Sequence, residues 1–158
     1  MTTKRQTSNV ERQTSVYHHQ QIGLKGEREA ERFLLDLGLV LLERRFGCRF
    51  GEVDLIFAEV DPGNGQITEI VFVEVKARTV TSYGRPEAAV SKAKRVRLMR
   101  TAQAYLNEKP VADANVRFDV VSIMYRADGR PDIEHFQDAF GHHELMDVDP
   151  WQDPDRHW

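Results

Sequence analysis

The spacing of apolar residues predicts an amphipathic helix near the start of the folded region. Over residues 23–37 they recur at i, i+3, i+4 and i+7, as Ala30, Phe33, Leu34 and Leu37. Gly38 comes next, and glycine commonly ends a helix. We therefore expect one helix here, with Glu27 in its first turn.

Alternation of apolar and polar residues then predicts three strands. Residues 39–46 and 50–60 are rich in strand-forming residues on either side of Gly47-Cys48. The third strand covers 67–78, with Val71, Val73 and Val75 on one face and Phe72, Glu74 and Lys76 on the other. Apolar residues on both of its faces predict a central position in the sheet.

The second half of the chain predicts one more helix and two more strands. Pro86 suits the first position of a helix that runs to about Asn107. Strands are expected over 116–125 and 133–136, separated by a turn at 127–129. The predicted order is αβββαββ, which fits a single α/β domain over residues 22–140.

The two ends of the chain lack these patterns. Residues 1–21 are polar and without periodicity, so we expect a disordered lead, and residues 141–158 an acidic flexible tail. The lone Cys48 cannot form an internal disulfide, and no apolar run resembles a signal peptide or a membrane span. We expect a soluble, cytoplasmic protein.

Charge is distributed unevenly along the chain. The net charge of −3 argues weakly against a nucleic-acid partner. From Asp132 onward, however, eight acidic residues face one base, whereas residues 85–109 contain seven bases and two acids. The basic segment therefore predicts a surface that faces phosphate.

Three charged residues on the predicted strands suggest a metal site. Glu74 and Lys76 are two residues apart, so their side chains share a face, and Asp54 projects from a strand that we expect beside them. Two carboxylates and the carbonyl of Val75 suffice to hold Mg²⁺, which keeps several waters, and Mn²⁺ is an alternative. Lys76 is then available to orient the attacking water, and Glu27 to support a second metal or a water.

A structural explanation competes with this one. Glu-x-Lys is a common sequence, and by pattern alone an exposed cross-strand ion pair is the more frequent explanation. Phe72 shares the face of Glu74, and Ile56 shares the face of Asp54. Both faces are therefore partly covered, and charges are seldom buried there without a partner or a function.

The second helix and the loop before it offer candidate phosphate contacts. Lys92 and Arg95 fall on the stripe that also contains Met99, where bases are unusual. We predict that Lys92 and Arg95, with Arg78 and Arg85 before them, bind nucleic acid. A plain solvated face explains the pattern equally well.

Several ordered motifs between residues 22 and 140 carry a family resemblance. These are Gly26-Glu27, Gly51-Glu52-Val53-Asp54-Leu55-Ile56, Val71-Phe72-Val73-Glu74-Val75-Lys76-Ala77-Arg78, Gly84-Arg85-Pro86-Glu87, Arg117-Phe118-Asp119-Val120-Val121 and Ala139-Phe140. They resemble the bacterial YraN-like family, a branch of the PD-(D/E)xK nuclease superfamily. The resemblance implies a restriction-endonuclease-like mixed sheet of about five strands flanked by helices, similar to archaeal Holliday-junction resolvases. It also places Asp54, Glu74 and Lys76 at the superfamily's catalytic positions.

The function that the resemblance implies is a Mg²⁺-dependent endonuclease acting on branched or structured DNA by phosphodiester hydrolysis. A homodimer is implied by analogy with the resolvases. Two alternatives stay open: a non-catalytic nucleic-acid-binding module with the same fold, and a protein-interaction domain that works through its acidic tail.

Overall fold

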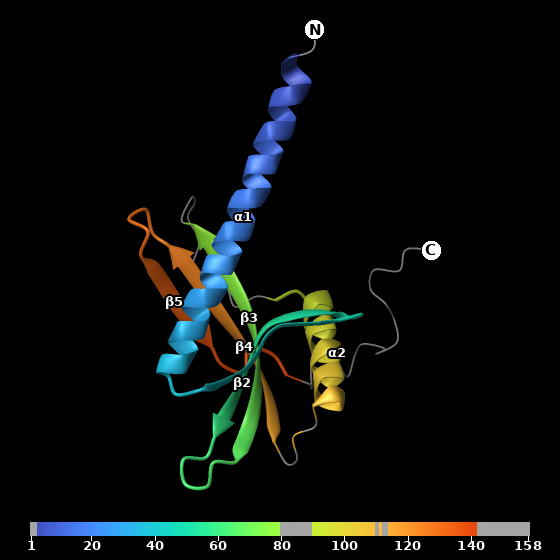
Figure 1. Cartoon of the computed structure of the whole chain (residues 1–158), viewed down its shortest axis with the longest axis vertical. Helices are drawn as coiled ribbons and strands as arrows, with labels where there is room; N and C mark the ends of the chain where they lie inside the picture. The colour runs from blue at the N-terminus through green and yellow to red at the C-terminus, as the bar shows by residue number, and fades with distance from the viewer. Residues whose placement is uncertain (1–2, 80–89, 110, 112–113, 142–158) are drawn as a thin grey trace.

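A five-stranded sheet with a helix on each side organises the chain (Figure 1). The computed structural model describes residues 3–79, 90–109, 111 and 114–141, and their side chains for Tyr17 and from Gln20 onward. The elements are α1 (Thr3–Asp36), β1 (Val40–Cys48), β2 (Gly51–Val60), β3 (Ile67–Thr79), α2 (Lys92–Glu108), β4 (Asn115–Tyr125) and β5 (Pro131–Phe136). This confirms the predicted order αβββαββ and the α/β class.

The sheet is mixed, and its strands lie in sequence order. β1, β2 and β3 pair antiparallel, β3 and β4 pair parallel, and β5 returns antiparallel to β4. A parallel pair needs a long crossover, which contains α2. β3 therefore lies at the centre of the sheet, as its apolar residues on both faces predicted.

Two apolar clusters cover the two faces. On the α1 side, Ala30 and Leu34 are fully buried with residues such as Leu55 and Val73 of the sheet. On the α2 side, Tyr105 packs against Phe72, with ring centroids 5.8 Å apart. Neither helix is long and apolar enough to cross a membrane, as judged over the residues that the structure describes.

The first helix is longer than the sequence predicted. We expected a disordered lead over residues 1–21, but α1 begins at Thr3 and its N-terminal part extends well beyond the sheet (Figure 1). Residues 3–22 contain neither glycine nor proline, the two strongest helix breakers. The missing apolar stripe therefore reflects missing tertiary packing rather than a break in the helix. Gly38, with φ of 90°, follows the end of α1 as predicted.

The second helix begins later than predicted. Pro86 lies outside the described residues, and Val90 and Ser91 are not helical. Ser91 has an extended backbone, and its hydroxyl oxygen accepts a hydrogen bond from the backbone nitrogen of Lys94 at 3.3 Å. Serine is a favoured N-cap because it satisfies an otherwise unpaired amide of the first turn. The helix accordingly begins at Lys92 and not at Pro86.

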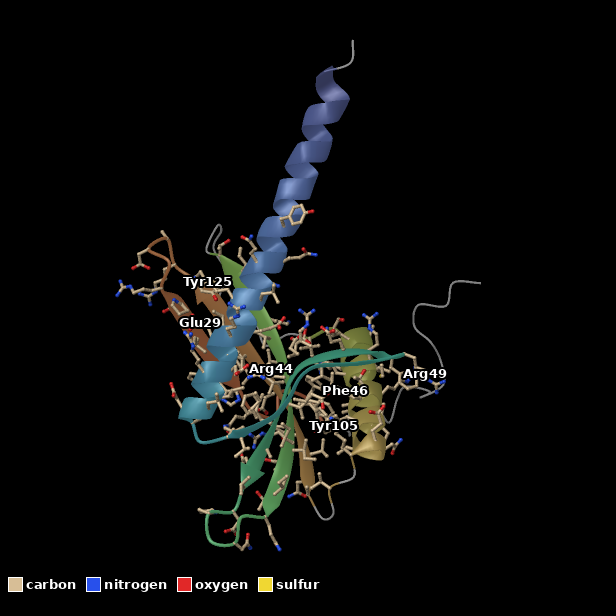
Figure 2. The ribbon with its side chains drawn as sticks, viewed as in Figure 1. Glu29, Arg44, Phe46, Arg49, Tyr105 and Tyr125 are labelled. Carbon is tan, nitrogen blue, oxygen red and sulfur yellow. The ribbon has the colours of Figure 1, made fainter. Side chains whose placement is uncertain are left out.

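The β1–β2 hairpin extends past the rest of the sheet and covers α2 (Figure 2). Phe46 of β1 contacts Tyr105 of α2 edge to face, with ring centroids 5.1 Å apart. Arg49 lies at the tip of the hairpin, where its guanidinium carbon is 4.6 Å from the centre of the Phe50 ring. The hairpin thus leaves the plane of the sheet and draws β2 away from β3.

Candidate active site at the fork between β2 and β3

The candidate site lies where β2 and β3 separate. Their pairing extends from Val60 and Ile67 only as far as Leu55 and Val73. Beyond that pair, β2 follows the hairpin toward α2, while β3 stays paired with β4 up to Thr79. We call this opening the fork. Asp54 and Glu74 are the first residues beyond the last β2–β3 pair, which places both carboxylates at the fork.

The side chain of Asp54 bridges the fork by a hydrogen bond to the backbone of β3. Its Oδ2 accepts a hydrogen bond from the backbone nitrogen of Val75 at 2.7 Å. Burial raises the pKa of Asp54 above its ordinary value, and the hydrogen bond from Val75 opposes part of that rise. A neutral backbone donor thus holds the carboxylate in place.

Glu74 is also largely buried, and its hydrogen bonding is less complete than that of Asp54. Its side chain is 12% exposed, and its Oε2 is buried without a hydrogen-bond partner. The Nζ of Lys94 lies 3.2 Å from that oxygen and forms an ion pair with it. Burial raises the pKa of Glu74, and the negative charge of Asp54 raises it further. The positive charges of Lys94 and Lys76 act in the opposite direction.

Glu27 reaches the fork from α1. Partial burial raises its pKa, and the charge of Asp54 is the next largest cause, so the two carboxylates are within electrostatic range. Arg45 of β1 lowers the pKa of Glu27. The position of α1 depends on Gly26, because a Cβ on that residue would lie 2.3 Å from the Cβ of Ala77. Only glycine lets the helix lie this close to β3.

The donor set at the fork fits a divalent cation. Burial and the neighbouring charge of Asp54 disfavour the ionised form of Glu74, and one of its oxygens has no hydrogen bond. A cation would relieve both. Within the described residues, no three His, Cys, Asp or Glu side chains are grouped to hold a metal. A cation here would therefore rely on Asp54, Glu74 and the carbonyl of Val75, with water completing its shell. Glu27 does not complete a three-carboxylate group.

The four predicted phosphate contacts differ in exposure and in whether the structure describes them. Arg78 is exposed near the end of β3, Lys92 is exposed at the start of α2, and Arg85 lies outside the described residues. Arg95 is half-buried, and its Nε donates to the carbonyl of Val90 at 2.7 Å. The structure therefore gives Arg95 a role in fixing the start of α2.

Sequence reasoning missed Lys94. The predicted helix began at Pro86, and its stripe of residues singled out Lys92 and Arg95. The signal that could have identified Lys94 is Ser91, whose N-cap fixes the first turn and hence the direction of each side chain.

The chain is thus an α/β domain in which two buried carboxylates lie at the fork of a mixed sheet. Lys76 of β3 and Lys94 of α2 lie close enough to act on the charge of Glu74. The uncharacterised protein family UPF0102 matches residues 26–123, and the chain belongs to that family. This confirms the YraN-like resemblance.

Relatives in this family match most of the chain. A UPF0102 protein of Rhodococcus opacus (strain B4) is 42% identical over 123 residues, covering 78% of this chain and 98% of its own. One from Geobacter sulfurreducens is 37% identical over 124 residues, covering 78% of this chain and 91% of its own. The family model, which matches residues 26–123, includes Glu27, Asp54, Glu74, Lys76 and Lys94, so the candidate site belongs to the part shared with the family.

Proposed function

We propose that the protein is a metal-dependent endonuclease that hydrolyses phosphodiester bonds of nucleic acid at the fork. The observation that carries the proposal is the buried Oε2 of Glu74, which has no hydrogen bond and lies beside a second buried carboxylate. A fold has no structural need for such an arrangement, whereas a cation site does.

Each residue of the fork has a role in this proposal. Asp54, Glu74 and the carbonyl of Val75 would hold Mg²⁺, which when bound supplies charge neutralisation at the phosphate and activation of water. Asp54 keeps its orientation because the Val75 amide holds it. Lys76 provides positive charge beside Glu74 and stabilises negative charge that develops on the phosphate. Glu27 orients water on the α1 side.

Nucleic acid is the proposed substrate because of the charge around the fork. Residues 92–107 of α2 contain five bases and no acid. The adjoining hairpin adds the exposed Arg49, and the guanidinium carbon of Arg100 lies 5.9 Å from the centre of the Phe50 ring. This basic surface suits a phosphate backbone. Branched or structured DNA is the preferred substrate by the family resemblance.

A nuclease panel tests the proposal. Branched, duplex and single-stranded DNA and RNA are incubated with wild type, Glu74→Gln and Glu134→Gln, in Mg²⁺, Mn²⁺ or a chelator. We expect Mg²⁺-dependent cleavage that Glu74→Gln lowers by about 100-fold or more, since the cation is worth several kcal/mol. Glu134→Gln changes an exposed carboxylate of β5 and should cleave like wild type. Equal cleavage by all three proteins would point to a contaminant and refute the proposal.

The ion pair between Lys94 and Glu74 favours one alternative, a nucleic-acid-binding module without turnover. In that case the lysine permanently neutralises the carboxylate. Lys76→Ala separates the two functions: an endonuclease loses cleavage but keeps binding. A binding module shows salt-sensitive binding that is indifferent to Asp54→Asn and no metal-dependent cleavage.

A further inference from the structure

Lys94 of α2 reaches the fork. Its backbone nitrogen is fixed by the Ser91 cap, and its Nζ is 3.2 Å from Oε2 of Glu74. Its neighbours differ: Arg95 donates to the carbonyl of Val90, and Lys92 is exposed. The first turn of α2 thus aims one ammonium group at the fork.

The contact falls on the same atom that a metal would need. Oε2 of Glu74 is buried, and the ammonium group of Lys94, 3.2 Å away, compensates its charge more strongly than Lys76 does. Two cations that meet at one oxygen repel each other strongly in a buried site. Lys94 and a divalent cation should therefore compete for Glu74.

The ammonium group of Lys94 can leave Glu74 at little energetic cost. Its side chain is 37% exposed, against 12% for Glu74, so much of the ammonium's hydration is retained in the pair. Ion pairs with an exposed partner contribute little net stability, and lysine is flexible. Moving the ammonium group toward solvent or substrate therefore costs little.

We propose that Lys94 is an additional residue of the site, which holds Glu74 in the metal-free protein and yields it to a divalent cation. Once displaced, its ammonium group faces the phosphate of the bound nucleic acid. This inference rests on the proposed function, because it takes the fork to be a metal site.

Metal affinity without nucleic acid tests the competition. Mn²⁺ binding is measured by electron paramagnetic resonance of the free ion for wild type, Lys94→Met, Lys94→Arg and Lys92→Met. Lys94→Met should bind Mn²⁺ roughly threefold to tenfold more tightly, the range expected for loss of one partly exposed charge. Lys94→Arg keeps the cation and should stay near wild type. Lys92→Met removes the same charge from an exposed position and should change affinity less than about twofold.

The outcomes separate this inference from the proposed function. Equal or weaker Mn²⁺ binding by Lys94→Met overturns the role of Lys94, and wild-type cleavage in the nuclease panel then still supports the endonuclease. Tighter binding by Lys94→Met with no cleavage of any nucleic acid supports the competition and refutes the endonuclease. If no variant binds Mn²⁺, both fail.

The salt dependence of DNA binding tests whether the displaced Lys94 contacts a phosphate. DNA binding is measured against salt concentration in Ca²⁺ and in chelator, for wild type and Lys94→Met. In Ca²⁺, the slope of log affinity against log salt should be steeper for wild type by about one, since one more phosphate is neutralised. In chelator the two slopes should agree. Equal slopes in Ca²⁺ would show that Lys94 does not reach the phosphate.

Discussion

Glu74 and Asp119 both place a carboxylate in the interior, but they differ in how completely its oxygens are hydrogen-bonded. Asp119 is fully buried, and its Oδ1 accepts hydrogen bonds from Nε of Arg117 and from the backbone nitrogen of Asp138, each at 2.9 Å. Its Oδ2 lies 2.8 Å from Nε2 of His135. Glu74, by contrast, has one oxygen without a hydrogen bond.

The difference separates a structural charge from a functional one. Arg117 also pairs with Glu59 at 2.8 Å and with Glu69 at 2.5 Å, so the Asp119 network joins β2, β3, β4 and β5. A buried charge whose partners are all present organises the fold. A buried carboxylate with an incomplete set of hydrogen bonds and a partly exposed ion-pair partner is a feature of binding sites. The two regions should therefore respond differently to substitution.

The largest effect on stability is expected at Asp119. Asp119→Ala leaves Arg117 and the amide of Asp138 without their buried partner, which should lower the free energy of unfolding by about 3–5 kcal/mol. Urea denaturation measures the change. Asp132→Ala removes an exposed aspartate that pairs with Arg126 and should have little effect. A small loss at Asp119 would remove the basis of the comparison.

A smaller loss is expected where α1 meets β3. Gly26→Ala places a Cβ against Ala77 and should destabilise the protein by about 1–3 kcal/mol, as overpacking generally does. It should also displace Glu27 from the fork and reduce cleavage. Gly23→Ala meets nothing within 4 Å in the same helix and should instead stabilise by roughly 0.5–1 kcal/mol. Similar unfolding midpoints for the two variants would contradict the close packing at Gly26.

The smallest effect concerns pH in metal-free protein. Burial and Asp54 raise the pKa of Glu74 above its ordinary 4.5, so the folded protein keeps a proton that the unfolded chain has lost. The stability that this proton contributes is present below pH 4.5 and is lost as the pH rises through the folded pKa. Wild type should therefore lose more stability than Glu74→Gln over that range, by at most about 1.4 kcal/mol per pH unit. Parallel pH profiles of the two proteins in chelator would show that folding does not raise the pKa of Glu74.

The order of elements could be predicted because periodicity reports local burial. The apolar residues of β3 on both faces predicted its central position, and Asp54, Glu74 and Lys76 were identified on the strands that the structure assigns them. What periodicity could not give is the separation of β2 from β3, because it depends on the hairpin packing against Tyr105.

The errors concern places where tertiary context or one capping residue decides. The Ser91 cap moved the start of α2 and with it the residue that meets Glu74. In α1, helix propensity continued where amphipathicity did not. Two of the partners of Asp119, His135 and Asp138, lie 16 and 19 residues further along the chain, and no local pattern predicts these contacts.

The hydrogen bond from Val75 to Asp54 has a consequence for comparing relatives. Any residue at position 54 must accept that amide, whether or not the protein cleaves anything, so an aspartate or asparagine there is favoured by the fold alone. No backbone hydrogen bond of this kind is seen for the Glu74 side chain within the described residues. A lineage that abandoned the chemistry could replace Glu74 first, which makes that position the better marker of activity.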